Sequence, residues 1–219
     1  MIPIISFIGS SGSGKTSLLE KVVKELKKRG LKVAVIKHSH HDDLGFDKQG
    51  KDSYRYTQAG ADVVVLSGTQ EMAIMKKTGH DLSPQEISRL LDIDIDVILT
   101  EGFKNASTMK IEVHRRDIES GLLSNPKQLL AVVTDEPLNG ITAPQFEFGK
   151  DNTLEIADLI EKWLDSQSRE QIELYVNGEF VPMKPFVQDI IARAMEGMAS
   201  SLKGVGEIKN IRFSMRRRR

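Results

Sequence analysis

The run at residues 9–16 constrains this chain more than any other part of its sequence. It reads Gly-Ser-Ser-Gly-Ser-Gly-Lys-Thr and fits the phosphate-binding pattern G-x-x-x-x-G-K-[ST]. The mostly apolar residues 2–8 come directly before it, and apolar residues at helical spacing follow it at positions 18, 19, 22, 23 and 26. A strand, a glycine-rich loop and a helix in this order predict a site for a nucleoside triphosphate.

The residue types of this loop suit a bound triphosphate. Gly9, Gly12 and Gly14 permit the backbone dihedrals and the close approach that turn several N–H groups onto one anion. Lys15 is expected to reach the β and γ phosphates as a point charge, and the Thr16 hydroxyl to coordinate Mg²⁺. The residues predicted to bind the nucleotide here are Gly9, Ser10, Gly12, Ser13, Gly14, Lys15, Thr16 and Ser17.

Strand and helix patterns alternate after the loop. Positive charge at residues 27–29, followed by Gly30, predicts the end of the first helix, and residues 31–37 read as the next strand. Apolar strands joined by helices run parallel with right-handed crossovers. We therefore expect an α/β fold, a P-loop NTPase with a mainly parallel sheet covered by helices on both faces. The later elements expected in this domain are strands at residues 63–66, 72–75, 97–99, 110–114 and 130–133, a helix from a capping box at residues 83–86 to residue 91, and a helix at residues 152–164.

The sequence also predicts a domain boundary at residues 166–168, between a P-loop domain, residues 1–166, and a small extension, residues 169–219. About fifty residues are marginal for independent stability, so we expect the extension to pack on the first domain or on a second copy of itself. The extension reads as a ββαβ unit with strands at residues 172–176 and 180–181 around an Asn177-Gly178 turn, a helix at residues 185–202 and a strand at residues 208–213.

Composition narrows the functional classes. Lys plus Arg and Asp plus Glu number 31 each, which gives no basic field for non-specific nucleic-acid binding. Cysteine is absent, which excludes disulfides and thiolate metal sites and fits a reducing compartment. No run resembles a secretory signal or approaches the roughly twenty apolar residues that cross a bilayer. These observations predict a cytoplasmic protein with neither a nucleic-acid nor a membrane partner.

Acidic residues near strand ends are the candidates for catalysis. Glu101 follows a predicted strand, at the place where a parallel sheet presents a carboxylate beside the phosphate loop. The polar segment after residue 37 is expected to face the γ-phosphate and contains Lys51 and Asp52, candidates for phosphate charge and for the magnesium shell or water activation. We predict Glu101 and Asp52 as catalytic residues, Thr16, Asp52 and Glu101 as Mg²⁺ ligands, and Lys51 as a nucleotide contact.

Two further features leave alternatives open. His38, His40 and His41 follow the second strand, and imidazoles bind zinc or nickel, although phosphate or partner contacts explain the same loop. Asp135 stands at the end of a later strand, where a carboxylate can accept from the N1–H and amine groups of guanine. The Asn-Lys part of the usual guanine motif is missing. Asp135 is therefore a predicted nucleotide contact that equally suits a turn before Pro137.

Four motifs follow the phosphate loop in order: His38-Ser39-His40-His41, Gly50-Lys51-Asp52-Ser53, Ala59-Gly60-Ala61 and Thr100-Glu101-Gly102-Phe103-Lys104. With them, the first domain, roughly residues 2–165, resembles the molybdopterin-guanine dinucleotide biosynthesis adaptor protein B family. The Gly-Lys-Asp-Ser and Glu-Gly-Phe-Lys segments are much more specific than the phosphate loop itself. The extension after residue 168 is absent from the shortest members of this family.

The resemblance implies a GTP-binding protein that hydrolyses GTP slowly, acts mainly as an adaptor and is usually a homodimer. Its partners would be the nucleotidyltransferase that attaches GMP to molybdopterin and molybdopterin itself, and its cofactors GTP and Mg²⁺. The residues carried over are Gly12, Gly14, Lys15 and Thr16 for phosphate, Asp52 and Glu101 for magnesium, and His38, Lys104 and Arg115 for a partner or anion surface.

Two other functions remain open. One is a P-loop GTPase that delivers a metal ion with the histidine loop at residues 38–41, and the other is an ATP-dependent small-molecule kinase or ligase. The lack of cysteine disfavours the metal chaperone, and the Glu-Gly-Phe-Lys motif disfavours the kinase.

Overall fold

The structure is a computed structural model and describes residues 2–39, 50–91, 94–118, 121–167, 172, 174–177, 179–208, 211, 213 and 215. Its contacts divide the chain into two units, residues 2–164 and residues 165–219. The helix that contains this division is α4 (Thr153–Gln167). The boundary expected from the sequence, residues 166–168, falls at the carboxyl end of the same helix.

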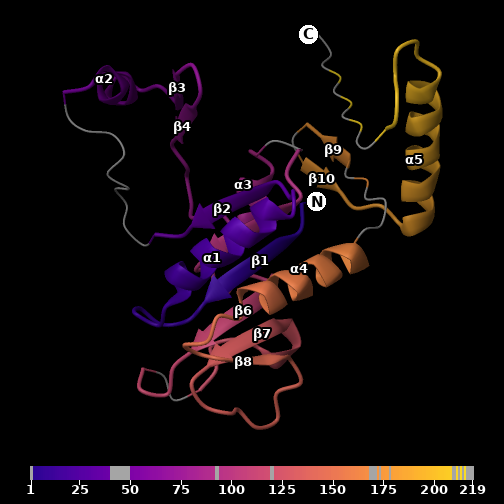
Figure 1. Cartoon of the computed structure of the whole chain (residues 1–219). Helices are drawn as coiled ribbons and strands as arrows, with labels where there is room; N and C mark the ends of the chain where they lie inside the picture. Colours follow the sequence, from indigo (N-terminus) through magenta and orange to yellow (C-terminus); the bar gives the residue numbers. More distant parts are fainter. Residues whose placement is uncertain are drawn as a thin grey trace. The chain divides into compact units, whose positions relative to one another are not determined.

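A six-stranded sheet forms the centre of the first unit (Figure 1). Its order is β2-β5-β1-β6-β7-β8, and every neighbouring pair runs parallel. The strands are β1 (Ile4–Ile8), β2 (Val33–Lys37), β5 (Val97–Glu101), β6 (Met109–His114), β7 (Leu129–Thr134) and β8 (Gln145–Glu147). The mainly parallel α/β sheet expected from the sequence is confirmed. Since β1 lies between β5 and β6, the segment that follows β1 emerges between the ends of both neighbours.

One face of the sheet packs against two helices, α1 (Lys15–Lys28) and α4. Side chains of a strand alternate between the two faces, which places Ile5 and Phe7 together in this core. The buried helix residues are Leu19, Val22 and Leu26 of α1 and Ile156, Ala157 and Ile160 of α4. These positions recur at helical spacing, so burial of one apolar stripe on each helix holds both against the strands.

The other face of the sheet buries polar groups that bind the connecting loops. Lys110 of β6 is 1% exposed, and its Nζ donates to the carbonyl oxygen of Ala106 at 2.7 Å and to Oε1 of Gln128 at 2.9 Å. Gln128 ends the short 3-10 helix η1 (Pro126–Gln128). Burial lowers the pKa of the Lys110 ammonium. The fully buried Glu112 accepts from the backbone N–H groups of Leu123 at 2.6 Å and Ser124 at 3.0 Å.

The strand at residues 63–66 is not part of the parallel sheet, contrary to the sequence-based expectation. It forms β3 (Val63–Ser67), which pairs antiparallel with β4 (Met72–Lys76) in a separate two-stranded sheet (Figure 1). Only Val64 of β3 is buried, whereas Val63 and Val65 are 45% and 50% exposed. A run of β-branched residues predicts a strand but does not indicate which sheet the strand belongs to. The helix α2 (Asp52–Gln58) contacts β3.

The helix α3 (Pro84–Ser88) begins at the predicted capping box. Ser83 Oγ accepts from the N–H of Glu86 at 3.3 Å, and a Glu86 carboxylate oxygen accepts from the N–H of Ser83 at 2.9 Å. The Ser83 hydroxyl also donates to this carboxylate at 2.7 Å. That bond first, and the bond from the Ser83 N–H second, lower the pKa of Glu86 to about 2. The helix ends earlier than residue 91, because its last backbone bonds close only tight turns at Leu90 and Leu91.

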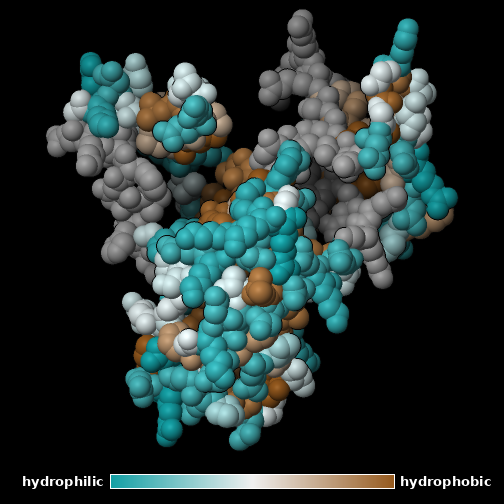
Figure 2. All heavy atoms as spheres, viewed as in Figure 1, coloured by the Kyte–Doolittle hydropathy of each residue, from teal (hydrophilic) through white to brown (hydrophobic). Residues whose placement is uncertain are grey.

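The second unit contains a hairpin of β9 (Leu174–Val176) and β10 (Glu179–Val181), followed by α5 (Pro185–Ser200). No residue of α5 is buried, and Phe186 and Ile190 are 72% and 51% exposed. Apolar atoms are visible along α5 in Figure 2. The last strand expected at residues 208–213 is wrong for the positions that the structure describes, because residues 208, 211 and 213 have no regular structure.

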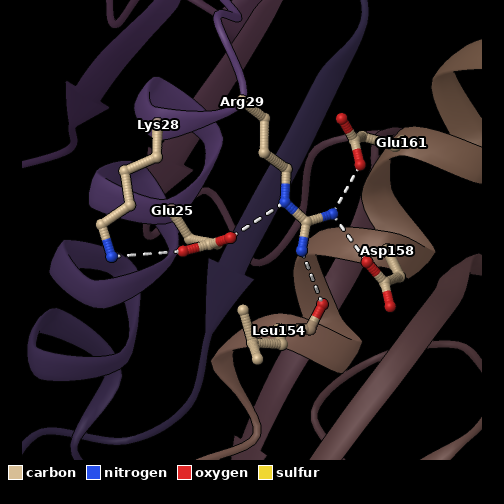
Figure 3. A network of polar contacts seen from close by, with 6 residues as sticks. All are labelled: Glu25, Lys28, Arg29, Leu154, Asp158 and Glu161. Atoms are coloured by element: carbon tan, nitrogen blue, oxygen red, sulfur yellow. Dashed lines mark hydrogen bonds and ion pairs between the residues drawn. The ribbon is translucent and has the colours of Figure 1, made fainter.

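The carboxyl end of α1 is tied to α4 by one arginine (Figure 3). Arg29 Nη1 donates to Asp158 at 2.6 Å and to Glu161 at 2.5 Å, while its Nε donates to Glu25 at 3.0 Å. These bonds, of which the one to Glu161 has the largest effect, raise the pKa of the Arg29 guanidinium above its ordinary value. The network fixes the two helices that cover the same face of the sheet. Among the described residues, no helix is long and apolar enough to cross a membrane.

Candidate functional site

The phosphate loop connects the carboxyl end of β1 to the first turn of α1. Gly9 and Gly14 have φ values of 142° and 95°, which favour glycine. A β-carbon on Gly9 would lie 2.4 Å from the carbonyl oxygen of Val113 on β6, so no side chain fits there. Lys15 Nζ donates to the carbonyl oxygen of Ser10 at 2.7 Å, which holds the lysine back over its own loop.

This loop fits a bound triphosphate. Ser13 is 1% exposed, and in the part of the chain that the structure describes its Oγ has no hydrogen-bond partner. A buried hydroxyl without a partner is costly, and a phosphate oxygen would satisfy it. The amino end of α1 adds unpaired backbone N–H groups and the positive end of the helix dipole. Backbone, hydroxyl and lysine thus favour the same anion.

Thr16, Lys37 and Glu101 meet beside this loop. Oε1 of Glu101 accepts from Thr16 Oγ1 at 3.0 Å and from Lys37 Nζ at 3.0 Å. The sheet register explains the meeting, since Glu101 is paired with Lys37 on β2 and with Phe7 on β1. Hydroxyl and carboxylate oxygens are the ligands that Mg²⁺ prefers, so Thr16 and Glu101 fit the predicted metal position.

The structure does not bring Asp52 to this position. Asp52 is the first residue of α2, and its carboxylate pairs with Arg55 at 3.4 Å. Lys51 precedes it at the amino-terminal cap of α2. Residues 40–49, which lead from the end of β2 toward this helix, lie outside the described part of the chain. The predicted roles of Asp52 and Lys51 therefore stay predictions. For Glu101, the position beside Thr16 supports the predicted role.

His38 contacts another motif of the sequence. Its Nε2 is 2.9 Å from a carboxylate oxygen of Asp81, and its ring lies 4.4 Å from the ring of Phe103. A β-carbon on Gly102 would approach that of His38 to 3.1 Å, so the histidine packs directly on the Glu-Gly-Phe-Lys segment. His40 and His41 lie outside the described residues. Within the described ranges, no three acidic or histidine side chains form a metal cluster.

The Asp135 carboxylate is hydrogen-bonded to two neighbouring arginines. It follows β7, and its two oxygens accept from Arg115 Nε at 2.8 Å and from the backbone N–H of Arg116 at 3.0 Å. These two bonds, the backbone bond first, hold the pKa of the carboxyl below its ordinary value. The Arg115 guanidinium lies 4.1 Å above the ring of Phe148. Phe148 in turn would be 3.1 Å from a β-carbon on Gly14, so this cluster adjoins the phosphate loop.

Sequence reasoning missed three of these residues. Lys37 ends a predicted strand, and a parallel pairing with the strand before Glu101 is the signal that could have found it. Phe148 follows β8, a strand of three residues that is too short for a pattern. His114 is 1% exposed at the end of β6, with Nε2 3.6 Å from Glu136, and its Nδ1 has no partner in the described ranges. A lone histidine at a strand end carries no such signal.

A central parallel strand followed by a glycine-rich loop, with lysine, threonine and glutamate converging on it, defines the P-loop nucleoside-triphosphate-binding class. The family model described as molybdopterin guanine dinucleotide synthesis protein B matches residues 4–135. The chain belongs to this family, which confirms the resemblance seen in its motifs.

Individual relatives agree with the family. A molybdopterin-guanine dinucleotide biosynthesis adapter protein from Haemophilus influenzae is 40% identical over 164 residues, which cover 74% of this chain and 90% of the relative. The adapter protein from Escherichia coli is 35% identical over 178 residues, covering 77% and 97%. A putative adapter protein from Methanocaldococcus jannaschii is 28% identical over 232 residues, with 97% of each chain covered. That last match reaches into the second unit of this chain.

Solved structures share the fold of the first unit. The crystal structure of Bacillus subtilis MobB superposes with a TM-score of 0.58 at 26% identity, covering 74% of this chain and 97% of that one. The crystal structure of a molybdopterin-guanine biosynthesis protein B gives a TM-score of 0.55 at 28% identity, covering 73% and 99%.

Proposed function

We propose that this chain is a GTP-binding adaptor that hydrolyses GTP slowly and assists the enzyme that attaches GMP to molybdopterin. The observation that carries the proposal is the convergence of Lys15, Thr16 and Glu101 at the end of the central strand. The names of the relatives, molybdopterin-guanine dinucleotide biosynthesis adapter proteins, support the pathway. A cytoplasmic location is part of the proposal, because the proposed ligands are a nucleoside triphosphate and a cofactor precursor.

The residues of the loop suggest a division of labour. Lys15 would leave the carbonyl of Ser10 for the β and γ phosphates, and Ser13 would donate to a phosphate oxygen. Thr16 and Glu101 would hold Mg²⁺, which supplies charge neutralisation of the phosphates. Glu101 also has a carboxylate oxygen to orient the attacking water. Phosphoryl transfer in this class is slow until a further cation, often an arginine of a partner, reaches the site.

Nucleotide binding is tested by Lys15→Ala. We expect this variant to lose GTP affinity by at least about 100-fold, because the lysine contributes charge to the triphosphate and little to packing. Lys21→Ala is the matched control, since Lys21 is a lysine of the same helix with a side chain 57% exposed. Calorimetry with GTP, ATP, zinc and nickel measures the affinities. Unchanged GTP affinity in Lys15→Ala, or a preference of the wild type for ATP or for a metal alone, contradicts the proposal.

The roles of the two acidic residues are separated by Glu101→Gln and Asp52→Asn. Glu101→Gln keeps the shape of the site and removes a charge next to the metal, so we expect retained GTP binding and hydrolysis slowed by about 10-fold or more. Single-turnover hydrolysis with and without Mg²⁺ measures this. If only Asp52→Asn slows turnover, Asp52 replaces Glu101 as the catalytic residue.

A homodimer is part of the proposal, and the β3–β4 hairpin supports it. Val65 faces Ile74 across the two strands, and both are at least half exposed, at 50% and 56%. Met72 on the same face is 63% exposed. Figure 2 shows apolar atoms at the surface of this hairpin. Sedimentation velocity should show a dimer that Ile74→Lys weakens, whereas Ala73→Lys, on the opposite face of the same strand, should leave it unchanged.

The partner is tested with the nucleotidyltransferase of the same organism. We expect the chain to bind this enzyme and to raise the yield of the guanine dinucleotide form of the cofactor when GTP and molybdopterin are present. Lys15→Ala should remove the gain while leaving the enzyme's own activity unchanged. A gain that survives loss of GTP binding would show that the adaptor role does not need the nucleotide.

A further inference from the structure

Three side chains at the carboxyl ends of neighbouring strands form a second polar site beside the phosphate loop. Arg115 follows β6, Asp135 follows β7 and Phe148 follows β8, and these strands lie next to one another in the sheet. The ring of Phe148 abuts Gly14 at the start of α1. A ligand whose phosphates bind the loop therefore has this cluster within reach of its other end.

Arg115 is held in one position, while the Nη groups of its guanidinium are available to a ligand. Its Nε is bonded to Asp135, and its guanidinium rests on the ring of Phe148. Within the described residues, neither Nη atom has a hydrogen-bond acceptor. The side chains of Arg115 and Asp135 are each 27% exposed, so ligand can reach them. Two parallel N–H groups on a fixed guanidinium match a pair of acceptors in one plane.

Asp135 is poorly placed to read a base by itself. Each of its oxygens already accepts a hydrogen bond, one from Arg115 Nε and one from the backbone of Arg116. Reading the N1–H and amine of guanine would compete with both bonds. Its geometry suits a positioning residue that fixes the direction of Arg115.

We propose that Arg115 and Phe148 bind the purine base of the nucleotide, with Arg115 selecting guanine through its O6 and N7 acceptors. Adenine presents an amine in place of O6, so the same guanidinium rejects it. The ring of Phe148 supplies apolar surface for either purine. This inference rests on the proposed function, because it assigns the base to a nucleotide whose phosphates are bound at Lys15.

The test compares triphosphates that differ only in the base, measured by calorimetry on the full chain with Mg²⁺. Wild type should bind GTP and inosine triphosphate equally, because both have O6 and N7. ATP and 7-deaza-GTP, which lacks N7, should bind about 10-fold or more weakly. Arg115→Met should lower GTP affinity to the level of ATP and leave the affinity for inorganic triphosphate unchanged.

Controls separate the roles of the three residues. Arg116→Met is matched, since its side chain is 76% exposed and only its backbone contacts Asp135, so the ratio of GTP to ATP affinity should stay as in wild type. Phe148→Leu should weaken both purines by the same factor, about 5-fold to 10-fold. Asp135→Asn should reduce the preference for GTP without any gain of affinity for xanthosine triphosphate.

Failure of the inference differs from failure of the proposed function. An unchanged ratio of GTP to ATP affinity in a folded Arg115→Met overturns the inference while GTP binding stands. Weak binding of inosine triphosphate, or a gain of xanthosine triphosphate binding in Asp135→Asn, means that Asp135 reads the exocyclic amine and again overturns it. Wild type that binds no triphosphate removes the proposed function itself.

Discussion

Phe7 in the first unit is fully buried, whereas Phe186 in the second unit is 72% exposed. The first unit encloses a core that joins four parallel strands to α1 and α4. The second has a hairpin and a helix of 16 residues without one buried residue. Because apolar burial is the main favourable term in folding, the first unit accounts for its own stability and the second does not. A helix with an apolar stripe at helical spacing is therefore not evidence of an independent core.

The largest effect is expected from Phe7→Ala. This change empties the centre of the core between β1 and the helices, so the free energy of unfolding should fall by about 3–5 kcal/mol. Urea unfolding followed by circular dichroism measures it. A loss below about 1 kcal/mol would mean that the first unit does not depend on this core, and the contrast between the units would disappear.

A smaller loss is expected from Arg29→Met, which keeps the aliphatic part of the side chain and removes the bonds to α4 (Figure 3). We expect about 1–2 kcal/mol, because a charged donor with several acceptors is lost from a half-exposed network. Lys28→Met is the control, since its side chain is 76% exposed and, among the residues that the structure describes, pairs only with Glu25. Equal stability of the two variants would show that α4 is held by apolar contacts alone.

The pH dependence of stability tests a smaller contribution to the first unit, that of Glu86. Its pKa is lowered to about 2 from an ordinary value of 4.5, so its contribution to stability is complete above pH 4.5 and is lost as the pH falls toward 2. Glu86→Gln should be less stable than wild type at neutral pH, and the two should converge at low pH. Thermal unfolding between pH 2.5 and pH 6 measures this. A constant difference across that range contradicts the sign of the shift.

The smallest effect is expected from Phe186→Ala, the counterpart of Phe7→Ala in the second unit. An exposed side chain loses little burial, so the free energy of unfolding should change by less than about 0.5 kcal/mol apart from a small helix-propensity gain. The same urea experiment measures it. A loss above about 1 kcal/mol would show that another surface covers this side of α5 in solution.

Much of the first unit could be predicted because local pattern and final burial coincide there. The strands β1, β5 and β7 are buried along nearly their whole length, so their apolar runs indicate a parallel sheet. The sheet to which β3 belongs could not be predicted in this way, since a β-branched run has the same pattern in a central sheet and in an isolated hairpin. The short strand β8 had no pattern, and with it Phe148 was missed.

The site divides along the same line. The positions of Lys15, Thr16 and Glu101 beside the phosphate loop could be predicted, because the loop is continuous in sequence and the carboxyl ends of parallel strands lie at one edge of the sheet. The contact of Arg115 with Asp135 joins residues 20 apart that follow different strands, and only the order of the sheet brings them together. The position of Asp52 could not be predicted, because the polar segment before it has no periodicity that would indicate where it lies.

Lys110 couples two loops that are distant in sequence. Its ammonium group bonds a carbonyl in the connection after β5, at Ala106, and a side chain in the connection before β7, at Gln128. Neither loop can open without leaving a buried cation with fewer acceptors, so the two should open together in one local fluctuation rather than separately. In hydrogen exchange, their amides would then share one opening free energy, and a substitution in one loop would be felt in the exchange rates of the other.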